Sequence, residues 1–248
     1  MAATSRARGR GGRPVVALAA ALGSAGALVA VGAGPAGALG PTASLSGAEI
    51  VSAASTAMAG VSSVTVDGTV GGSAQNIVVA MAVNRGGDAQ GTLSLNGSVI
   101  KVIRLGPTVY LSTNAQGLGE FGLTTTEEQA FKGRWVFGKS STQPFAALAP
   151  LDQITTLVDS VVGTLHGSSW TKLGTTTVGG RPAVAVEVHG AAEGDETIDV
   201  AASGPPYVLK LTAAAKGEAG TIVFSHFDRP LVPKVPAKAV PISSVTGS

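Results

Sequence analysis

The stretch 63-SVTVDGTVGGSAQNIVVAMAVNRGGDAQGTLSLNGSVIKVIRLGPTVYLST-113 decides the fold of this chain. It holds five runs rich in Val, Ile, Leu and Thr, separated by turn signals. The strongest of these signals is Asn96-Gly97, because a type I′ turn needs φ > 0 at both central residues. Connections this short join antiparallel neighbours, since a parallel return needs a crossover of about a dozen residues or more. The pattern predicts a meander with strands at Ser63–Val70, Gln75–Val83, Asp88–Leu95, Ser98–Leu105 and Thr108–Thr113.

A second meander is predicted closer to the C-terminus. Its runs alternate more regularly between apolar and polar residues, which is typical of strands with one wet face. The extended tail Asp228–Pro241 follows; its four prolines exclude a central strand. The predicted strands are Trp170–Val178, Pro182–His189, Thr197–Ala201, Tyr207–Ala213 and Gly220–Phe227.

Helices are predicted before and between the meanders. Ser46 and Glu49 have the spacing of a capping box, which begins a helix that runs to about Gly60. Shorter helices are expected at 124–131 and 144–148. Leu151–Val162 reads as a helix with an apolar stripe that includes Leu157 and Val161. The order predicts an α+β fold with one curved antiparallel sheet, and two domains divided near residues 140–150 are the alternative.

Some strands of the first meander are apolar on both faces. Ile77–Val83 reads Ile-Val-Val-Ala-Met-Ala-Val, and Ser98–Leu105 carries apolar residues on both sides. Antiparallel sheets usually keep one polar face, so this pattern predicts cover on both sides. Helices could form one cover; a second sheet, a partner or an apolar ligand could form the other.

Residues 1–38 are typical of a secretory signal peptide. Four arginines precede the apolar segment Val15–Val31, and Ala36-Gly37-Ala38 has the small-x-small form of a cleavage site. An uncleaved membrane anchor is the alternative. We expect a short linker at 39–45, a single domain at 46–236 and an extended tail at 237–248.

The predicted mature chain has no basic character. Without residues 1–38 it keeps 13 basic and 15 acidic residues, a net charge of −2, whereas the whole chain is formally +2. No nucleic acid partner is therefore expected. The chain has no cysteine, so neither disulfides nor a thiol nucleophile can form.

The sequence has no catalytic or metal-binding signature. Gly117–Gly122 matches G-x-G-x-x-G, but the antiparallel context contradicts a dinucleotide site. His166, His189 and His226 lack metal-ligand spacing. The acidic run from Glu193 to Asp199 is interpreted as a solvated hairpin tip rather than a calcium site. We therefore expect no enzyme activity, no cofactor and no metal; a hydrolase would need a hydroxyl or carboxylate close to one of the histidines.

The order of several soft motifs resembles the actinobacterial LppX/LprA/LprF/LprG lipoprotein family, which is related to the LolA-like carriers. After an N-terminal helix, the segments that carry the resemblance are Ser63–Val70, Val109–Leu111, Gly133–Val136, Gly179–Val184, Gly204–Lys210 and Ile222–Phe227. The resemblance spans nearly all of Leu45–Pro236. One departure is clear, because the family's lipobox cysteine is absent from Ala36–Ala43.

The resemblance implies a half-barrel whose helices cover the concave face of the sheet, and an apolar cavity for the acyl chains of envelope lipids or lipoglycans. It predicts an exported, non-enzymatic lipid carrier of the cell envelope, released or held by an uncleaved N-terminal segment. Its expected partners are the lipid and an envelope membrane or transporter. A structural protein with a filled core is the alternative. The predicted cavity residues are Val79, Met81, Leu93, Leu95, Ile100, Val102, Leu111, Leu157 and Val161.

Overall fold

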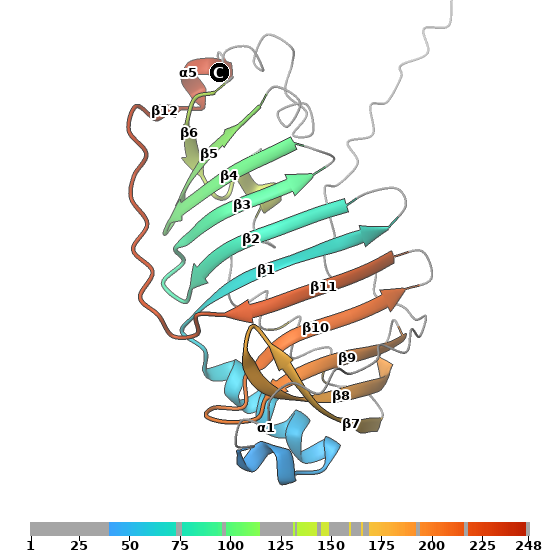
Figure 1. Cartoon of the computed structure of the whole chain (residues 1–248). Helices are drawn as coiled ribbons and strands as arrows, with labels where there is room; N and C mark the ends of the chain where they lie inside the picture. The colour runs from blue at the N-terminus through green and yellow to red at the C-terminus, as the bar shows by residue number, and fades with distance from the viewer. Residues whose placement is uncertain are drawn as a thin grey trace, which may run out of the picture.

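One open sheet dominates the computed structural model (Figure 1). The structure describes residues 40–72, 76–95, 98–114, 131, 133–142, 145–148, 159, 165, 169–191, 194–215 and 218–246. Within this part the sheet has 12 strands in the order β12-β6-β5-β4-β3-β2-β1-β11-β10-β9-β8-β7. The strands are β1 (Ser63–Gly72), β2 (Asn76–Asn84), β3 (Ala89–Leu95), β4 (Ser98–Leu105), β5 (Thr108–Thr113), β6 (Val136–Lys139), β7 (Ser169–Val178), β8 (Arg181–Ala191), β9 (Gly194–Ala201), β10 (Val208–Ala215), β11 (Glu218–Ser225) and β12 (Val240–Pro241).

Both predicted meanders are confirmed, and they share this sheet. Strands β1 to β6 pair antiparallel in chain order, and so do β7 to β11. The two halves are joined by antiparallel pairing of β1 with β11. The curved antiparallel α+β class is therefore confirmed, while the predicted boundaries of a single domain stay a prediction.

Several strands are longer than the sequence predicts. Gly71 and Gly72 were expected in a turn, yet they continue β1 and pair with Ala219 and Glu218. Small residues extend β8 and β10 in the same way. Glycine has a low strand propensity, but pairing on both sides can hold it in a strand. Gly179-Gly180 does form a turn, with φ of 54° and 79°, as a type I′ hairpin requires.

Helix α1 (Gly47–Gly60) begins as predicted. The Ser46 side chain accepts a hydrogen bond from the Glu49 amide, and a Glu49 carboxylate oxygen accepts from the Ser46 amide at 2.8 Å. These contacts complete the capping box, and the hydrogen bonds from Ser46 lower the pKa of Glu49. Ile50, Ala54 and Met58 are buried and join the main core, so this helix buries one apolar face.

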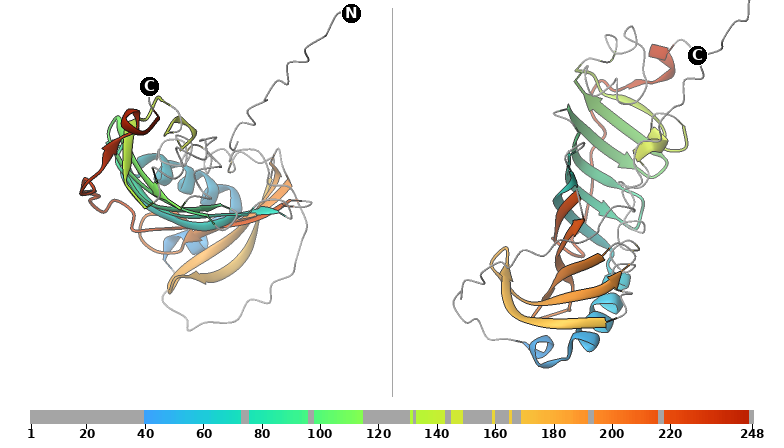
Figure 2. Two further views of the ribbon diagram at one scale, coloured as in Figure 1. Left: turned by 90° about the horizontal axis from the view of Figure 1, so that it is seen from above. Right: turned by 90° about the vertical axis from the view of Figure 1, so that its right-hand side faces the viewer.

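The sheet is strongly curved, with α1 on its inner side (Figure 2). Buried side chains alternate along the strands, so the inner face holds the core. At the β7 end, Gly47 of α1 lies against Trp170. At the β6 end, Phe145 of the short helix η2 (Phe145–Leu148) lies over Gly138. The ends of the inner face are thus covered by elements outside the sheet.

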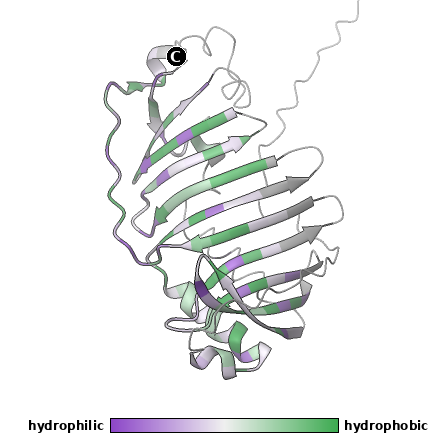
Figure 3. Cartoon of the chain, in the orientation of Figure 1, coloured by the Kyte–Doolittle hydropathy of each residue, from purple (hydrophilic) through white to green (hydrophobic). Residues whose placement is uncertain are grey.

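The outer face of β2 and β4 is open to solvent, which corrects the expectation of cover on both sides. Figure 3 shows β2 coloured apolar along most of its length. Only its inner-facing residues are deeply buried, whereas Val78 is 42% exposed and Val99 of β4 is 45% exposed. Small and β-branched residues occupy this face, so the sequence pattern overstated its burial.

The chain after β11 returns along one end of the strands to the far edge of the sheet (Figure 1). There β12 pairs in parallel with β6, through bonds from the Val240 amide to Trp135 O and from the Ile242 amide to Phe137 O. The expectation that this proline-rich tail makes no central strand is confirmed, since β12 is an edge strand. A final short helix, α5 (Ser243–Thr246), follows.

Candidate functional site

The seven sheet residues predicted to line a cavity lie on the inner face. Strand pairing places Met81, Val102 and Leu111 in one row across the sheet, with Gly91 between the first two. A second row places Val79, Leu93 and Ile100 side by side. Leu95 follows in the next row, and all seven side chains are buried. This wall, defined as Val79, Met81, Leu93, Leu95, Ile100, Val102 and Leu111, is continuous and apolar.

Leu157 and Val161, the two residues predicted on the covering helix, lie outside the described residues. From the long segment between β5 and β7, three described side chains outside β6 join the core that includes the wall. They are Phe131, Phe145 and Leu165, all deeply buried. The segment that was expected to cover the inner face therefore contributes apolar groups to it.

Two glycines of the sheet lie where neighbouring strands approach each other closely. A Cβ on Gly91 would lie 2.1 Å from the Ala80 carbonyl oxygen and 2.8 Å from the sulfur of Met81. A Cβ on Gly68 would lie 2.4 Å from the Thr221 carbonyl oxygen. Such close approach needs a residue without a side chain. These positions allow neighbouring strands to curve toward each other.

Two polar side chains on the inner face were not anticipated. Ser98 is fully buried beside Leu95, and its hydroxyl has no hydrogen-bond partner among the residues that the structure describes. A buried unpaired hydroxyl costs about 1–3 kcal/mol. Glu196 is also buried, in the same row as Val188 of β8.

For Glu196 and Asp199 the interpretation as part of a solvated hairpin tip is wrong, whereas Glu193 lies outside the described residues. β9 begins at Gly194, so Glu196 and Asp199 lie within the sheet and both are buried. Asp199 forms an ion pair with Lys210 of β10 at 2.6 Å. No group of three potential metal ligands occurs in the described part of the chain.

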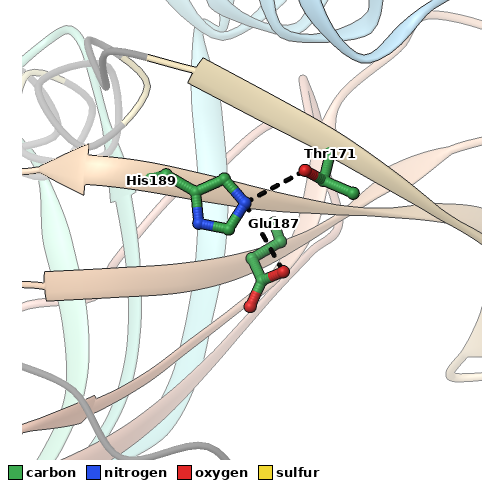
Figure 4. A network of polar contacts seen from close by, with 3 residues as sticks. All are labelled: Thr171, Glu187 and His189. Atoms are coloured by element: carbon green, nitrogen blue, oxygen red, sulfur yellow. Dashed lines mark hydrogen bonds and ion pairs between the residues drawn. The ribbon is translucent and has the colours of Figure 1, made fainter.

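The histidine with the most developed polar network is His189, on β8 (Figure 4). Its Nε2 lies 3.0 Å from Thr171 Oγ1 and 3.6 Å from a Glu187 carboxylate oxygen. A catalytic triad needs the hydroxyl and the carboxylate on opposite ring nitrogens, whereas here both face Nε2. His226 Nδ1 lies 3.1 Å from Ser225 Oγ, a contact between chain neighbours. Neither arrangement has the geometry of that triad.

A cluster of hydrogen-bonded polar residues, called the knot here, joins the start of β1 to the end of β11; its members are Ser62, Tyr207 and Asp228. Asp228 accepts hydrogen bonds from the amide and hydroxyl of Ser62, at 2.7 and 2.8 Å, and from the Tyr207 hydroxyl at 2.6 Å. The hydrogen bond from Tyr207, followed by those from Ser62, lowers the pKa of Asp228. The same hydrogen bond between Tyr207 and Asp228 raises the pKa of Tyr207. Arg85 donates to the Val61 and Ala59 carbonyls at the end of α1.

Comparison with solved structures places the fold. LprF from Mycobacterium bovis superposes with a TM-score of 0.56 at 15% identity, over 77% of this chain and 97% of LprF. The lipoprotein LppX from Mycobacterium tuberculosis gives a TM-score of 0.48 at 13% identity, over 75% of this chain and 96% of LppX. No protein-family model and no curated protein matches the sequence. The family resemblance seen in the sequence is thus confirmed as a likeness in fold.

Proposed function

We propose that this protein is a non-enzymatic carrier that holds the acyl chain of an envelope lipid against the inner face of its sheet. The observation that supports the proposal most directly is the continuous apolar wall on the concave side of an open, curved sheet. Each methylene removed from water contributes about 0.8 kcal/mol. An apolar wall is therefore sufficient to bind an acyl chain, and this binding needs no catalytic group.

The proposal places the protein outside the cytoplasm, released or held by its N-terminal segment. The signal-like residues 1–38 support export. Among the described residues, no helix has the length and apolar character needed to cross a membrane. The bound molecule is a lipid or lipoglycan with at least one acyl chain, and an envelope membrane or transporter delivers or receives it.

A pair of neighbouring residues in β4 provides the test. Ile100 lies on the wall and is 3% exposed, whereas Val99 faces outward. We expect Ile100→Trp to fill the space above the wall and to weaken uptake of a fluorescent fatty acid at least tenfold. Val99→Trp adds the same side chain to the outer face and should leave uptake within twofold of the wild type.

Circular dichroism and thermal unfolding of both variants show whether each has folded, and native mass spectrometry of wild-type protein from its own host detects a co-purifying lipid. If the folded wild type is empty and takes up no fatty acid, the carrier proposal fails. The same fold would then serve as a structural protein with a filled core.

A further inference from the structure

The segment 229–239, called the strap here, carries the most exposed apolar side chains of the described chain. Val232 is 80% exposed and Val235 is 61% exposed. The strap is held at both ends, because Ser63 Oγ donates to the Arg229 carbonyl at its start and β12 pairs with β6 just beyond its end. Two large apolar groups are therefore presented to solvent on an anchored segment.

The strap must be extended to reach its end point. Asp228 is bonded to the start of β1, and β12 lies six strand positions away from β1 in the sheet. At the usual spacing of neighbouring strands, this is a distance of about 29 Å. The 12 residue steps from Asp228 to Val240 span about 37 Å as polyproline II but only about 18 Å as a helix. Prolines at 230, 233 and 236 exclude the helix.

The proline spacing also decides which side chains face outward. Polyproline II has three residues per turn, so prolines at every third position share one side of the strap, and Val232 and Val235 share another. Pro233 is buried while both valines are exposed. Pro233 thus faces the body of the protein and Pro236 is partly buried, although Pro230 at the start of the strap is exposed, and the valines face away from the body.

The strap is also basic. Arg229, Lys234 and Lys238 are exposed, and the chain has no acidic residue from position 229 to its end. The nearest acidic residue in sequence is Asp228, whose carboxylate is bonded to Ser62 and Tyr207. Apolar and basic residues thus alternate along the strap (Figure 3), on a predicted mature chain that is acidic overall.

We infer that the strap docks on the surface of an anionic lipid membrane. Cations near such a surface each strengthen binding about fivefold, and exposed apolar groups enter the boundary between headgroups and acyl chains. A specific protein partner is the weaker fit, because stable interfaces bury about 800 Å² on each side, more than one extended segment presents. The inference concerns a surface distinct from the inner wall, so it does not depend on the proposed cargo.

Cosedimentation of the full chain with vesicles tests the inference. The vesicles are phosphatidylcholine alone or phosphatidylcholine with 30% phosphatidylglycerol. We expect binding to the anionic vesicles only, weakened by 0.5 M salt because screening shortens the reach of the charges. Lys234→Glu should reduce binding about tenfold or more. Lys101→Glu, on an exposed residue of β4 with the same change in net charge, should stay within twofold of the wild type.

The valines have a matched control of their own. Val232→Ser with Val235→Ser should weaken binding several-fold, whereas Val78→Ser with Val99→Ser, on the outer face of the sheet, should not. Residues 1–38 are common to all variants, so their contribution cancels in each comparison. Equal losses in the strap variants and their controls, or binding to neutral vesicles alone, would overturn the inference, as would no binding at all.

Fatty-acid uptake is measured on the same preparations. Lys234→Glu should leave uptake unchanged if the wall and the strap act separately. If the wild type binds vesicles but takes up no fatty acid, the carrier proposal fails and the membrane-docking inference stands. If it takes up fatty acid but does not bind vesicles, the membrane-docking inference fails and the carrier proposal stands.

Discussion

At the scale of single residues, Asp228 does more than its position in a loop suggests. Its φ is +56°, a conformation that most L-residues avoid but that Asp and Asn tolerate. From this conformation the carboxylate reaches both Ser62 and Tyr207, and the Asp228 amide donates to the Ser63 carbonyl at 2.8 Å. One residue therefore connects the end of β11, the start of β1 and the turn before β10.

We predict that Asp228→Asn lowers the free energy of unfolding by about 1 kcal/mol at pH 7. Asn keeps the tolerance for positive φ but loses the charge that strengthens the hydrogen bonds. The pKa of Asp228 is lowered in the folded state, so its stabilisation is complete above the unfolded pKa and is lost as pH falls through the folded pKa. Urea unfolding from pH 7 to pH 2.5 should show the two proteins converging at the acid end.

The charge control for this experiment is Asp67→Asn, at an exposed position of β1. It should change the free energy of unfolding by less than about 0.5 kcal/mol. Identical pH profiles for the Asp228 and Asp67 variants would contradict the role assigned to the knot.

At the scale of elements, the curvature of the inner wall depends on close strand approach. Gly91 of β3 lies beneath Met81 of β2 and beside its backbone, with no space for a methyl group. The same holds for Gly68 of β1 against β11. Both glycines lie in the middle of strands, where sequence rules treat glycine as a weakness; here it allows the sheet to bend.

We predict that Gly91→Ala destabilises the protein by about 2 kcal/mol, because the new methyl group forces β2 and β3 apart. Gly60→Ala, at the last residue of α1, is the matched control, since a Cβ there meets nothing within 4 Å. Its free energy of unfolding should stay the same or rise by a few tenths of a kcal/mol. Equal stability of the two variants in urea unfolding would show that the strands can yield.

At the scale of the whole molecule, the first and the last described segments contact the two edge regions of the sheet. The N-terminal lead contacts β7, where Lys172 Nζ donates to the Leu45 carbonyl at 2.9 Å and also to the Ala43 carbonyl. The C-terminal strand β12 pairs with the four-residue strand β6. Short edge strands fray readily unless a neighbour pairs with them.

We predict that a chain ending after Ala239 loses protection in β6 but not in β8 to β10. Removing β12 removes the bonds to Trp135 O and Phe137 O and makes β6 the edge of the sheet. Hydrogen exchange should be at least tenfold faster in β6, and the melting temperature should fall by a few degrees. A chain ending after Thr246 keeps β12 and should match the full chain; unchanged exchange in β6 of the shorter chain would exclude a supporting role for β12.

Much of the candidate wall was accessible from the sequence. The predicted strand bounds and tight turns determined which residues share a face, because strand period and hairpin register are local properties. Since β2 and β4 are apolar on both faces, the sequence did not determine which face is the inner one. Glu196 and Asp199 were missed for the opposite reason. Their burial depends on pairing with β8 and β10 and, for Asp199, on Lys210, and a single sequence does not display those partners.

Ten of the described strands, the capped helix and the antiparallel order within each meander were predictable from the sequence, because these follow from interactions between residues close in the chain; β6 and β12 were not predicted. The long-range contacts became visible only in the folded protein: β1 pairs with β11, Asp228 joins the start of β1 to the end of β11, and the strap crosses the strand ends to reach β6. Each of these contacts joins segments separated by about 100 residues or more. Their geometry is selected by burial and curvature of the whole sheet, which no local pattern encodes.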